Sequence, residues 1–140
     1  MTKPQILIIE DNPADVELLR MALDQQGEPY ELTVLTDGAE ALAYVYGRQR
    51  GVREPEPCAM LLEVHLPKYD GLEVLSQIRR EPSLRHIQVV MLAAGPVRPE
   101  VESRIHREGA IFRAKPRQLS EVMELAAEVL RLCKSALSPV

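Results

Sequence analysis

Five short apolar segments alternate with five segments of helical pattern along the chain. The first, Gln5–Glu10, is apolar up to a terminal acid and is short enough to be a buried parallel strand. This alternation predicts right-handed crossovers and a parallel sheet. We expect strands at residues 5–10, 31–36, 58–63, 87–92 and 110–114, with helices at residues 13–27, 39–46, 72–80, 99–108 and 119–135. Residues 47–57, rich in Arg, Gly, Pro and Glu, are predicted to form a surface loop.

The length and composition fit one globular domain that spans residues 1–140. Of the 140 residues, 46% are hydrophobic and 27% are charged, which is typical of a protein with an ordinary core. The net charge of −4 argues against nucleic acid as a direct partner, because phosphate contacts need clustered Lys and Arg. No segment resembles a signal peptide or a spanning helix, so we expect a cytoplasmic protein with no membrane partner.

The two cysteines, Cys58 and Cys133, have neither metal-binding nor redox spacing. For a cytoplasmic protein the expected state is a pair of reduced thiols. Cys133 lies in the last helix, far along the chain from Cys58, and is interpreted as a small core residue rather than as a disulfide partner.

The stretch Met60–Gly71 is the most informative local pattern. It runs from an apolar strand into the acid Glu63 and then through Leu66-Pro67 and an Asp70-Gly71 turn into a helical pattern. Ligand sites in open α/β sheets lie beyond the carboxyl ends of the strands. A carboxylate at this strand end is therefore a candidate site residue.

This stretch closely resembles the central strand and loop of two-component response-regulator receiver domains, which read Leu-Leu-Asp-x-x-Leu-Pro-x-x-Asp-Gly. The resemblance covers almost the whole chain, from the motif Glu10-Asp11-Asn12 to Lys115-Pro116. It implies a flavodoxin-like (βα)5 doubly wound fold with the strand order 2-1-3-4-5. In that order Glu10, Asp11 and Glu63 converge on one pocket.

The resemblance also implies roles for the pocket residues. The acids after the first strand would hold Mg²⁺, Asp11 directly and Glu10 through water, with Glu63 and the backbone carbonyl of His65 as further ligands. Lys115 matches the lysine that pairs with the phosphoryl group, and its neighbour Pro116 is a candidate for a cis peptide bond.

Phe112 matches a switch aromatic of the family. As the only Phe in the chain, it could equally be a core residue.

Two positions depart from the family pattern. Glu63 stands where the family has its phosphate-accepting aspartate, and its extra methylene moves the carboxylate by roughly 1.5 Å. A misplacement on that scale can cost about 100-fold in rate. Ala93 stands where the family has the Thr or Ser whose hydroxyl binds a phosphoryl oxygen. We therefore expect a pseudo-receiver with weak Mg²⁺ binding, in which Glu63 reaches toward Lys115; the alternative is a slow but functional phospho-acceptor.

The pattern of the last helix predicts a partner surface. Besides a core-facing stripe, a second apolar stripe contains Leu125, Val129 and Leu132. It predicts a symmetric dimer through the fourth helix, fifth strand and fifth helix, with Arg104 and Arg113 at the rim; the alternative is a broad interior face.

Overall, the chain resembles stand-alone receivers that partner bacterial phytochrome kinases. The expected partner is thus a histidine kinase or another signalling protein, contacted by a receiver without an output domain.

A signalling module that is not an enzyme is the expected class. A flavodoxin-like cofactor enzyme is disfavoured because no Gly-, Ser- or Thr-rich phosphate loop follows the first strand. Metal-dependent hydrolysis is disfavoured because His65, His86 and His106 are scattered rather than paired at ligand spacing.

Overall fold

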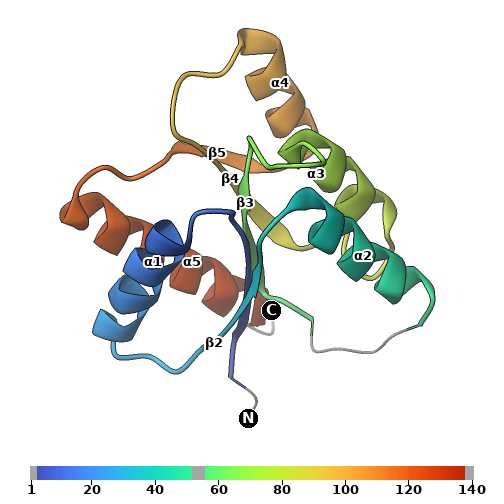
Figure 1. Cartoon of the computed structure of the whole chain (residues 1–140). Coiled ribbons are helices and arrows are strands. Elements are labelled where there is room, and N and C mark those ends of the chain that lie inside the picture. Colours follow the sequence, from blue (N-terminus) through green and yellow to red (C-terminus); the bar gives the residue numbers. More distant parts are fainter. Residues whose placement is uncertain (1–2, 52–55, 138–140) are drawn as a thin grey trace.

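The computed structural model of the chain describes residues 3–51 and 56–137, in which five strands alternate with five helices (Figure 1). The predicted alternation is confirmed, with boundaries that move by a few residues. The elements are β1 (Gln5–Ile9), α1 (Pro13–Gln25), β2 (Glu31–Leu35), α2 (Gly38–Gln49), β3 (Ala59–Glu63), α3 (Gly71–Arg80), β4 (Gln88–Ala93), α4 (Pro99–Arg107), β5 (Ile111–Ala114) and α5 (Leu119–Leu137).

The five strands form one parallel sheet in the order β2-β1-β3-β4-β5, which confirms the predicted flavodoxin-like order. The central strand β3 is buried at all five positions, whereas the edge strands β2 and β5 are partly exposed. Because every pair is parallel, all five strands end at the same edge of the sheet. This edge is where the candidate site residues were expected.

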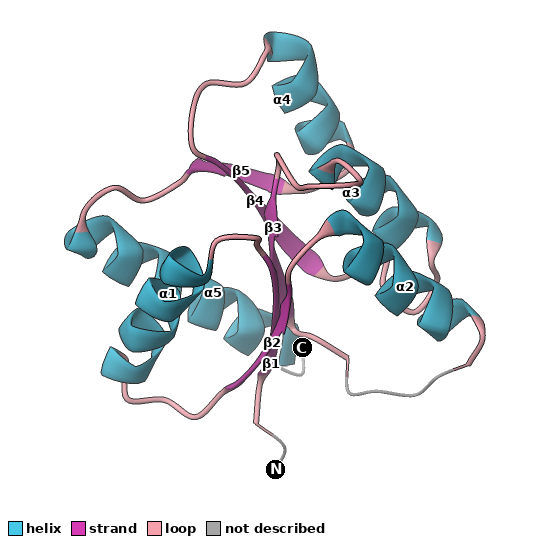
Figure 2. Ribbon diagram, viewed as in Figure 1, coloured by secondary structure: helices cyan, strands magenta, loops and turns pink. Residues whose placement is uncertain are grey.

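Helices cover both faces of the sheet, with α1 and α5 on one face and α2, α3 and α4 on the other (Figure 2). Side chains of β1 alternate between the two cores, as a strand buried on both faces requires. Leu7 and Ile9 belong to the core under α2, α3 and α4, and Ile6 and Ile8 belong to the core under α1 and α5.

Side-chain caps begin three of the helices. Asn12 accepts a hydrogen bond from the Ala14 amide at 2.9 Å, and Asp37 accepts one from the Glu40 amide at 2.8 Å. Asp70 caps α3 in the same way.

The helix α2 continues to Gln49, past the predicted end at residue 46, so the predicted loop starts later. Residues 52–55 of that loop lie outside the described residues. Within the described part of the chain, no helix is long and apolar enough to cross a membrane.

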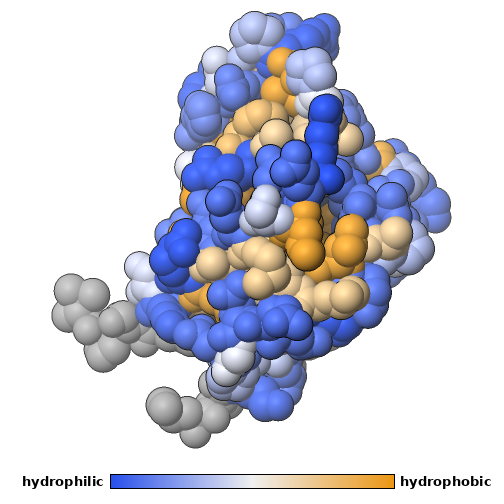
Figure 3. Space-filling view, turned by 90° about the vertical axis from the view of Figure 1, so that its left-hand side faces the viewer, coloured by the Kyte–Doolittle hydropathy of each residue, from blue (hydrophilic) through white to orange (hydrophobic). Residues whose placement is uncertain are grey.

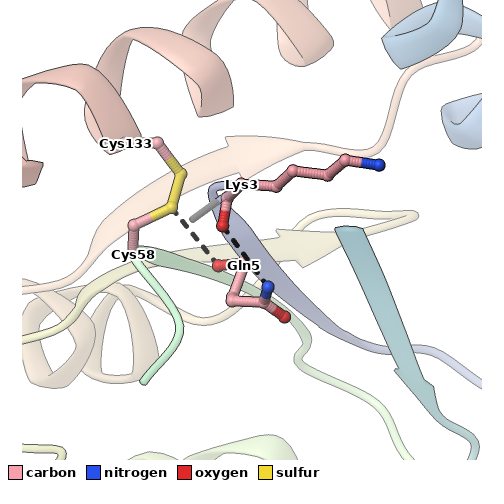
Figure 4. Close-up of a disulfide and its surroundings, with 4 residues drawn as sticks. All are labelled: Lys3, Gln5, Cys58 and Cys133. Atoms are coloured by element: carbon pink, nitrogen blue, oxygen red, sulfur yellow. Dashed lines mark hydrogen bonds between the residues drawn. A yellow bond between two sulfur atoms is a disulfide. The ribbon is translucent and has the colours of Figure 1, made fainter. Parts of the chain in front are cut away.

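The expectation of two reduced thiols is wrong, because Cys58 and Cys133 form a disulfide with a Cα–Cα distance of 4.8 Å (Figure 4). The topology explains the pairing. Since β5 ends at the carboxyl edge of the sheet, α5 runs back toward the opposite edge, where β3 begins. The end of α5 and the start of β3 therefore meet, although 75 residues separate the cysteines.

The disulfide also lies against β1. The Cys58 amide donates a hydrogen bond to the Gln5 carbonyl at 2.8 Å. The Cys58 sulfur lies 3.3 Å from the same oxygen, and the dashed line that starts at this sulfur in Figure 4 marks the approach. A disulfide sulfur has no proton to donate, so this second approach is a contact and not a hydrogen bond.

The predicted partner stripe on α5 is wrong at two positions. Leu125 and Val129 are buried in the core under α1 and α5, and Leu132 is partly buried against that core. The reason is that α5 packs against α1 as well as against the sheet, so it needs two interior faces. Leu119, the first residue of α5, is 68% exposed.

The arginines expected at the rim of that stripe make contacts within the chain. Arg104 donates a hydrogen bond to the Ser76 hydroxyl at 2.6 Å. Arg113 forms an ion pair with Glu128 at 2.9 Å.

Candidate functional site

Four predicted site residues come together at the carboxyl edge of the sheet: Glu10 follows β1, Glu63 ends β3, Ala93 ends β4 and Lys115 follows β5. Backbone hydrogen bonds align the last three strand ends. The Val64 amide donates to the Leu92 carbonyl at 2.8 Å, and the Lys115 amide donates to the Ala93 carbonyl at 2.8 Å. The sheet itself thus fixes where these side chains start.

The ammonium of Lys115 lies among three carboxylates, a group that we call the ion cluster. Its Nζ is 2.7 Å from Asp15 Oδ2, 3.0 Å from Glu10 Oε2 and 3.2 Å from Glu63 Oε2. The Glu10 and Glu63 side chains are 3% and 4% exposed, so these two charges are almost wholly removed from water. Burial of this kind is unfavourable unless the charges are paired. Lys115 supplies that pairing.

Glu63 is only partly satisfied within the cluster. Its buried Oε2 atom makes no hydrogen bond, because the Lys115 ammonium at 3.2 Å is close enough for an ion pair but is not aligned as a donor. A buried acceptor without a hydrogen bond is costly and rare in folded proteins. This oxygen is therefore a place where a further donor or cation would be stabilised.

The loop after β3 holds Glu63 in place. The Gly71 amide donates a hydrogen bond to the Val64 carbonyl at 2.9 Å. A Cβ atom at position 71 would lie only 2.3 Å from the Glu63 carbonyl oxygen. Only glycine permits this close approach, which brings the start of α3 against the end of β3.

The ion cluster shifts the pKa of two of its members. Burial raises the pKa of Glu10 to about 7, although hydrogen bonds from Lys115 and from the Asn12 amide oppose the shift. Burial alone would lower the pKa of Lys115, but hydrogen bonds with Asp15 and Glu10 and the charges of Glu10 and Glu63 raise it above its ordinary value. Lys115 therefore stays charged across the physiological range.

The raised pKa of Glu10 predicts a pH-dependent stability. A carboxyl with a higher pKa in the folded state stabilises that state at low pH, and this contribution is lost as the pH rises from about 4.5 to about 7. The side chain at position 10 of the Glu10→Gln variant is uncharged at every pH. Between pH 5 and pH 8, the free energy of unfolding of this variant should therefore fall by about 2 kcal/mol less than that of the unmodified chain. Urea denaturation at several pH values measures this.

The exposed Glu17 is the matched control for this change, because its carboxylate is 64% exposed and pairs only loosely with Arg20 at 3.7 Å. Glu17→Gln should leave the pH profile unchanged. Identical profiles for Glu10→Gln and the unmodified chain would contradict the raised pKa.

Not every predicted residue joins the ion cluster. Asp11 and His65 are exposed, and neither forms an ion pair with Lys115. The role of the His65 backbone carbonyl as a metal ligand stays a prediction. Ala93 ends β4 at the same edge of the sheet as the ion cluster, with its side chain buried in the core under α2, α3 and α4. Phe112 packs against the same core while half-buried, which agrees with the alternative that it is a core residue. The Lys115–Pro116 peptide bond is trans, since no cis bond occurs in the described residues, so the cis expectation is wrong.

Asp15 is the site residue that the sequence did not indicate. It lies in the first turn of α1, three residues after the cap Asn12. Acids are common there because they interact favourably with the helix dipole, so its sequence position had an ordinary explanation. Only the packing of α1 against α5, the helix that follows Lys115, shows that the Asp15 carboxylate makes the shortest ion pair with Lys115.

The ion cluster itself is not arranged as a metal site, and the predicted Mg²⁺ site of Asp11, Glu63, the His65 carbonyl and Glu10 through water stays a prediction. Carboxylate oxygens are suitable ligands for Mg²⁺, but a divalent ion needs several of them around one open position. Here the Lys115 ammonium occupies the point where Glu10, Asp15 and Glu63 converge. Accordingly, no group of three or more His, Cys, Asp or Glu side chains in the described part of the chain is arranged to hold a metal ion.

Comparison with known proteins gives consistent results. Residues 6–127 match the family described as the response regulator receiver domain. Response regulator Rcp1 of Synechocystis sp. is 32% identical over 120 residues, which are 86% of this chain and 82% of Rcp1. The structure of the phosphorylated cyanobacterial phytochrome response regulator RcpA has a TM-score of 0.83 at 28% identity and covers 98% of both chains. The Mn²⁺-bound form of response regulator Rcp1 has a TM-score of 0.77 at 29% identity, over 90% of this chain and 91% of that one.

The family match, the 2-1-3-4-5 sheet and the cluster of acids with a lysine at its carboxyl edge all agree. Receiver domains are signalling modules of two-component systems. This chain belongs to the response regulator receiver domain family.

Proposed function

We propose that this chain is a pseudo-receiver, which signals through protein contacts without ordinary aspartyl phosphorylation. The observation that carries the proposal is the pairing of Glu63 with Lys115 at 3.2 Å. The residue at the acceptor position is thus bound to the lysine that would otherwise meet a phosphoryl group. Ala93, which has no hydroxyl, supports the same conclusion.

A slow but functional phospho-acceptor is the second candidate. The chain keeps Glu10 and Lys115 in the pocket, and the similar RcpA structure is that of a phosphorylated protein. In this second function the Glu63 carboxylate would have to break its ion pair with Lys115 before it could attack a phosphoryl donor. This requirement would make phosphoryl transfer slow.

The proposed partner is a histidine kinase of the bacterial phytochrome type. The relatives named phytochrome response regulators support this partner class. An apolar patch on α1 and the start of α5 supports the contact surface, where Leu18, Met21 and Leu119 are 44%, 56% and 68% exposed. Figure 3 shows this side of the molecule, with an apolar area inside a mostly hydrophilic surface. Leu18 also lines the cavity beside Lys115, so a partner bound there would cover the ion cluster.

Other parts of the proposal follow from the same observations. Divalent cations bind weakly, because Lys115 occupies the centre of the carboxylate cluster. A symmetric dimer through α4, β5 and α5 stays a prediction, with Leu132, Arg104 and Arg113 as its remaining surface residues. The cytoplasmic location stays a prediction as well.

The test is calorimetric titration of the chain with the kinase domain of a bacterial phytochrome from the same genome. We expect the chain to bind the kinase with similar affinity before and after the kinase has phosphorylated itself. If the kinase carries a radiolabelled phosphoryl group, the label should stay on the kinase. Met21→Glu should weaken binding at least tenfold, whereas Tyr46→Glu, at another exposed apolar position on α2, should not. Transfer of label to the chain would support the second candidate instead, and unchanged binding of Met21→Glu would exclude the proposed surface.

A further inference from the structure

The loop between β3 and α3 contains a backbone conformation that side chains disfavour. Lys68 has a φ of 70°, and in the described part of the chain it is the one residue other than glycine with a positive φ. The Tyr69 amide donates a hydrogen bond to the Pro67 carbonyl at 2.9 Å, which closes a γ-turn around Lys68. A γ-turn with a positive φ at its centre is rare and strained. Such a turn persists only where the neighbouring structure holds it.

The N-terminus of α2 holds the tip of this loop. The Gly38 amide donates a hydrogen bond to the Pro67 carbonyl at 3.2 Å, and the Lys68 ammonium forms an ion pair with the Asp37 carboxylate at 3.3 Å. Gly38 also packs closely against Tyr69. A Cβ atom at position 38 would overlap the Tyr69 carbonyl oxygen and would lie 2.6 Å from the Tyr69 Cβ. The tip is thus attached to an element that is distant from it in sequence.

The base of the loop is attached to the sheet by other contacts. The Gly71 amide donates a hydrogen bond to the Val64 carbonyl at 2.9 Å, so the two ends of the loop meet. The Val64 amide donates to the Leu92 carbonyl of β4 at 2.8 Å. Val64 and Gly71 are buried, whereas Lys68 and Tyr69 at the tip are exposed. Base and tip are therefore held separately, and the strained residue belongs to the tip.

We propose that residues 65–70 form a hinged flap with two positions, one docked on α2 as in the structure and one released from α2, with Lys68 relaxed to a negative φ. The strain at Lys68 favours release and so offsets part of the contacts with α2. Those contacts involve no member of the ion cluster, so the flap moves without a phosphoryl group. This inference goes beyond the proposed function and does not depend on it, because the flap would also open in a phospho-accepting chain.

Amide hydrogen exchange of the full chain, followed by NMR, measures the opening of the flap. The protection factor of the Tyr69 amide reports on the tip, and those of the Val64 and Gly71 amides report on the base. In the unmodified chain we expect the tip amide to be at least tenfold less protected than the base amides. The reason is that release of the tip leaves the hydrogen bonds of the base intact.

Gly38→Ala should keep the flap in its released position. The added methyl group takes the place of the Tyr69 carbonyl, while alanine is favourable within α2 itself. We expect the protection of the Tyr69 amide to fall at least tenfold and that of the Val64 and Gly71 amides to stay within twofold. Gly95→Ala is the matched control, because a Cβ atom at position 95 meets nothing within 4 Å, and it should change none of the three values.

Two substitutions at Lys68 test the strain. Both Lys68→Gly and Lys68→Ala remove the ion pair with Asp37, but only glycine adopts a positive φ without a steric cost. The Tyr69 amide should therefore be at least fivefold more protected in Lys68→Gly than in Lys68→Ala. Equal protection in these two variants would show that the turn stores no strain.

Two further results would overturn the flap. Unchanged protection of the Tyr69 amide in Gly38→Ala would show that α2 does not hold the tip. Equal losses of protection at Tyr69, Val64 and Gly71 would show that the loop opens only together with the edge of the sheet. Neither result concerns the pseudo-receiver function, which is overturned instead by a phosphoryl group on the unmodified chain.

Discussion

Reduction of the Cys58–Cys133 disulfide should lower the free energy of unfolding by about 4 kcal/mol, which is the chain-entropy value for a bridge that closes a loop of 75 residues. The bridge joins the start of β3 to the end of α5 and so ties the central strand to the last helix (Figure 4). Both cysteines are buried in the same core, so their side chains stay packed after reduction. The loss of stability therefore comes mainly from the greater conformational entropy of the unfolded chain.

Urea denaturation with and without a reductant measures this effect. Alkylation followed by intact mass confirms the number of free thiols in each sample. The variant Cys58→Ala/Cys133→Ala has no bridge, so its unfolding midpoint should not respond to the reductant. An unchanged midpoint in the reduced unmodified chain, with both thiols shown to be free, would contradict the expected stabilisation.

Lys115→Met should destabilise the folded chain by about 3 kcal/mol at pH 7, because removal of one partner leaves buried charges without compensation. Glu10 and Glu63 are both nearly inaccessible to water, and methionine fills a similar volume without a charge. The measurement is the free energy of unfolding in urea, in buffer that contains a metal chelator. The chelator separates this loss from any rescue by a divalent ion.

Two comparisons show whether the loss is electrostatic. Lys134→Met makes the same chemical change at a lysine that is 67% exposed, and should cost less than about 0.5 kcal/mol. Adding Glu63→Gln to Lys115→Met should restore part of the stability, with a coupling energy of about 1 kcal/mol or more. Equal losses in the two lysine variants would mean that the ion cluster does not stabilise the fold.

The sequence was sufficient for the sheet and for much of the pocket. Five apolar runs separated by helical patterns lead to a parallel sheet, and the carboxyl ends of parallel strands meet at one edge. Glu63 follows directly from this rule because it ends a strand, whereas Glu10 and Lys115 were assigned to the pocket by the resemblance to receiver domains. The expected reach of Glu63 toward Lys115 is seen as their ion pair.

The features that the sequence did not predict depend on how helices pack. Asp15 reaches Lys115 only because α1 packs against α5, the helix that follows Lys115, and Cys133 meets Cys58 only because α5 returns to the start of β3. Val129 is buried because α1 covers a second face of α5. Each of these contacts joins elements that are distant in sequence, and neither element's own pattern specifies the orientation of the other.

The most direct test of the account is the intact mass of the unmodified chain after incubation with Mg²⁺ and a small acyl-phosphate donor, beside Glu63→Asp. We expect no phosphoryl group on the unmodified chain, because Glu63 is displaced by one methylene and paired with Lys115. A gain in Glu63→Asp alone would locate the block at that methylene, and no gain in either would extend it to Ala93 and the closed ion cluster. A phosphoryl group on the unmodified chain would contradict the pseudo-receiver function.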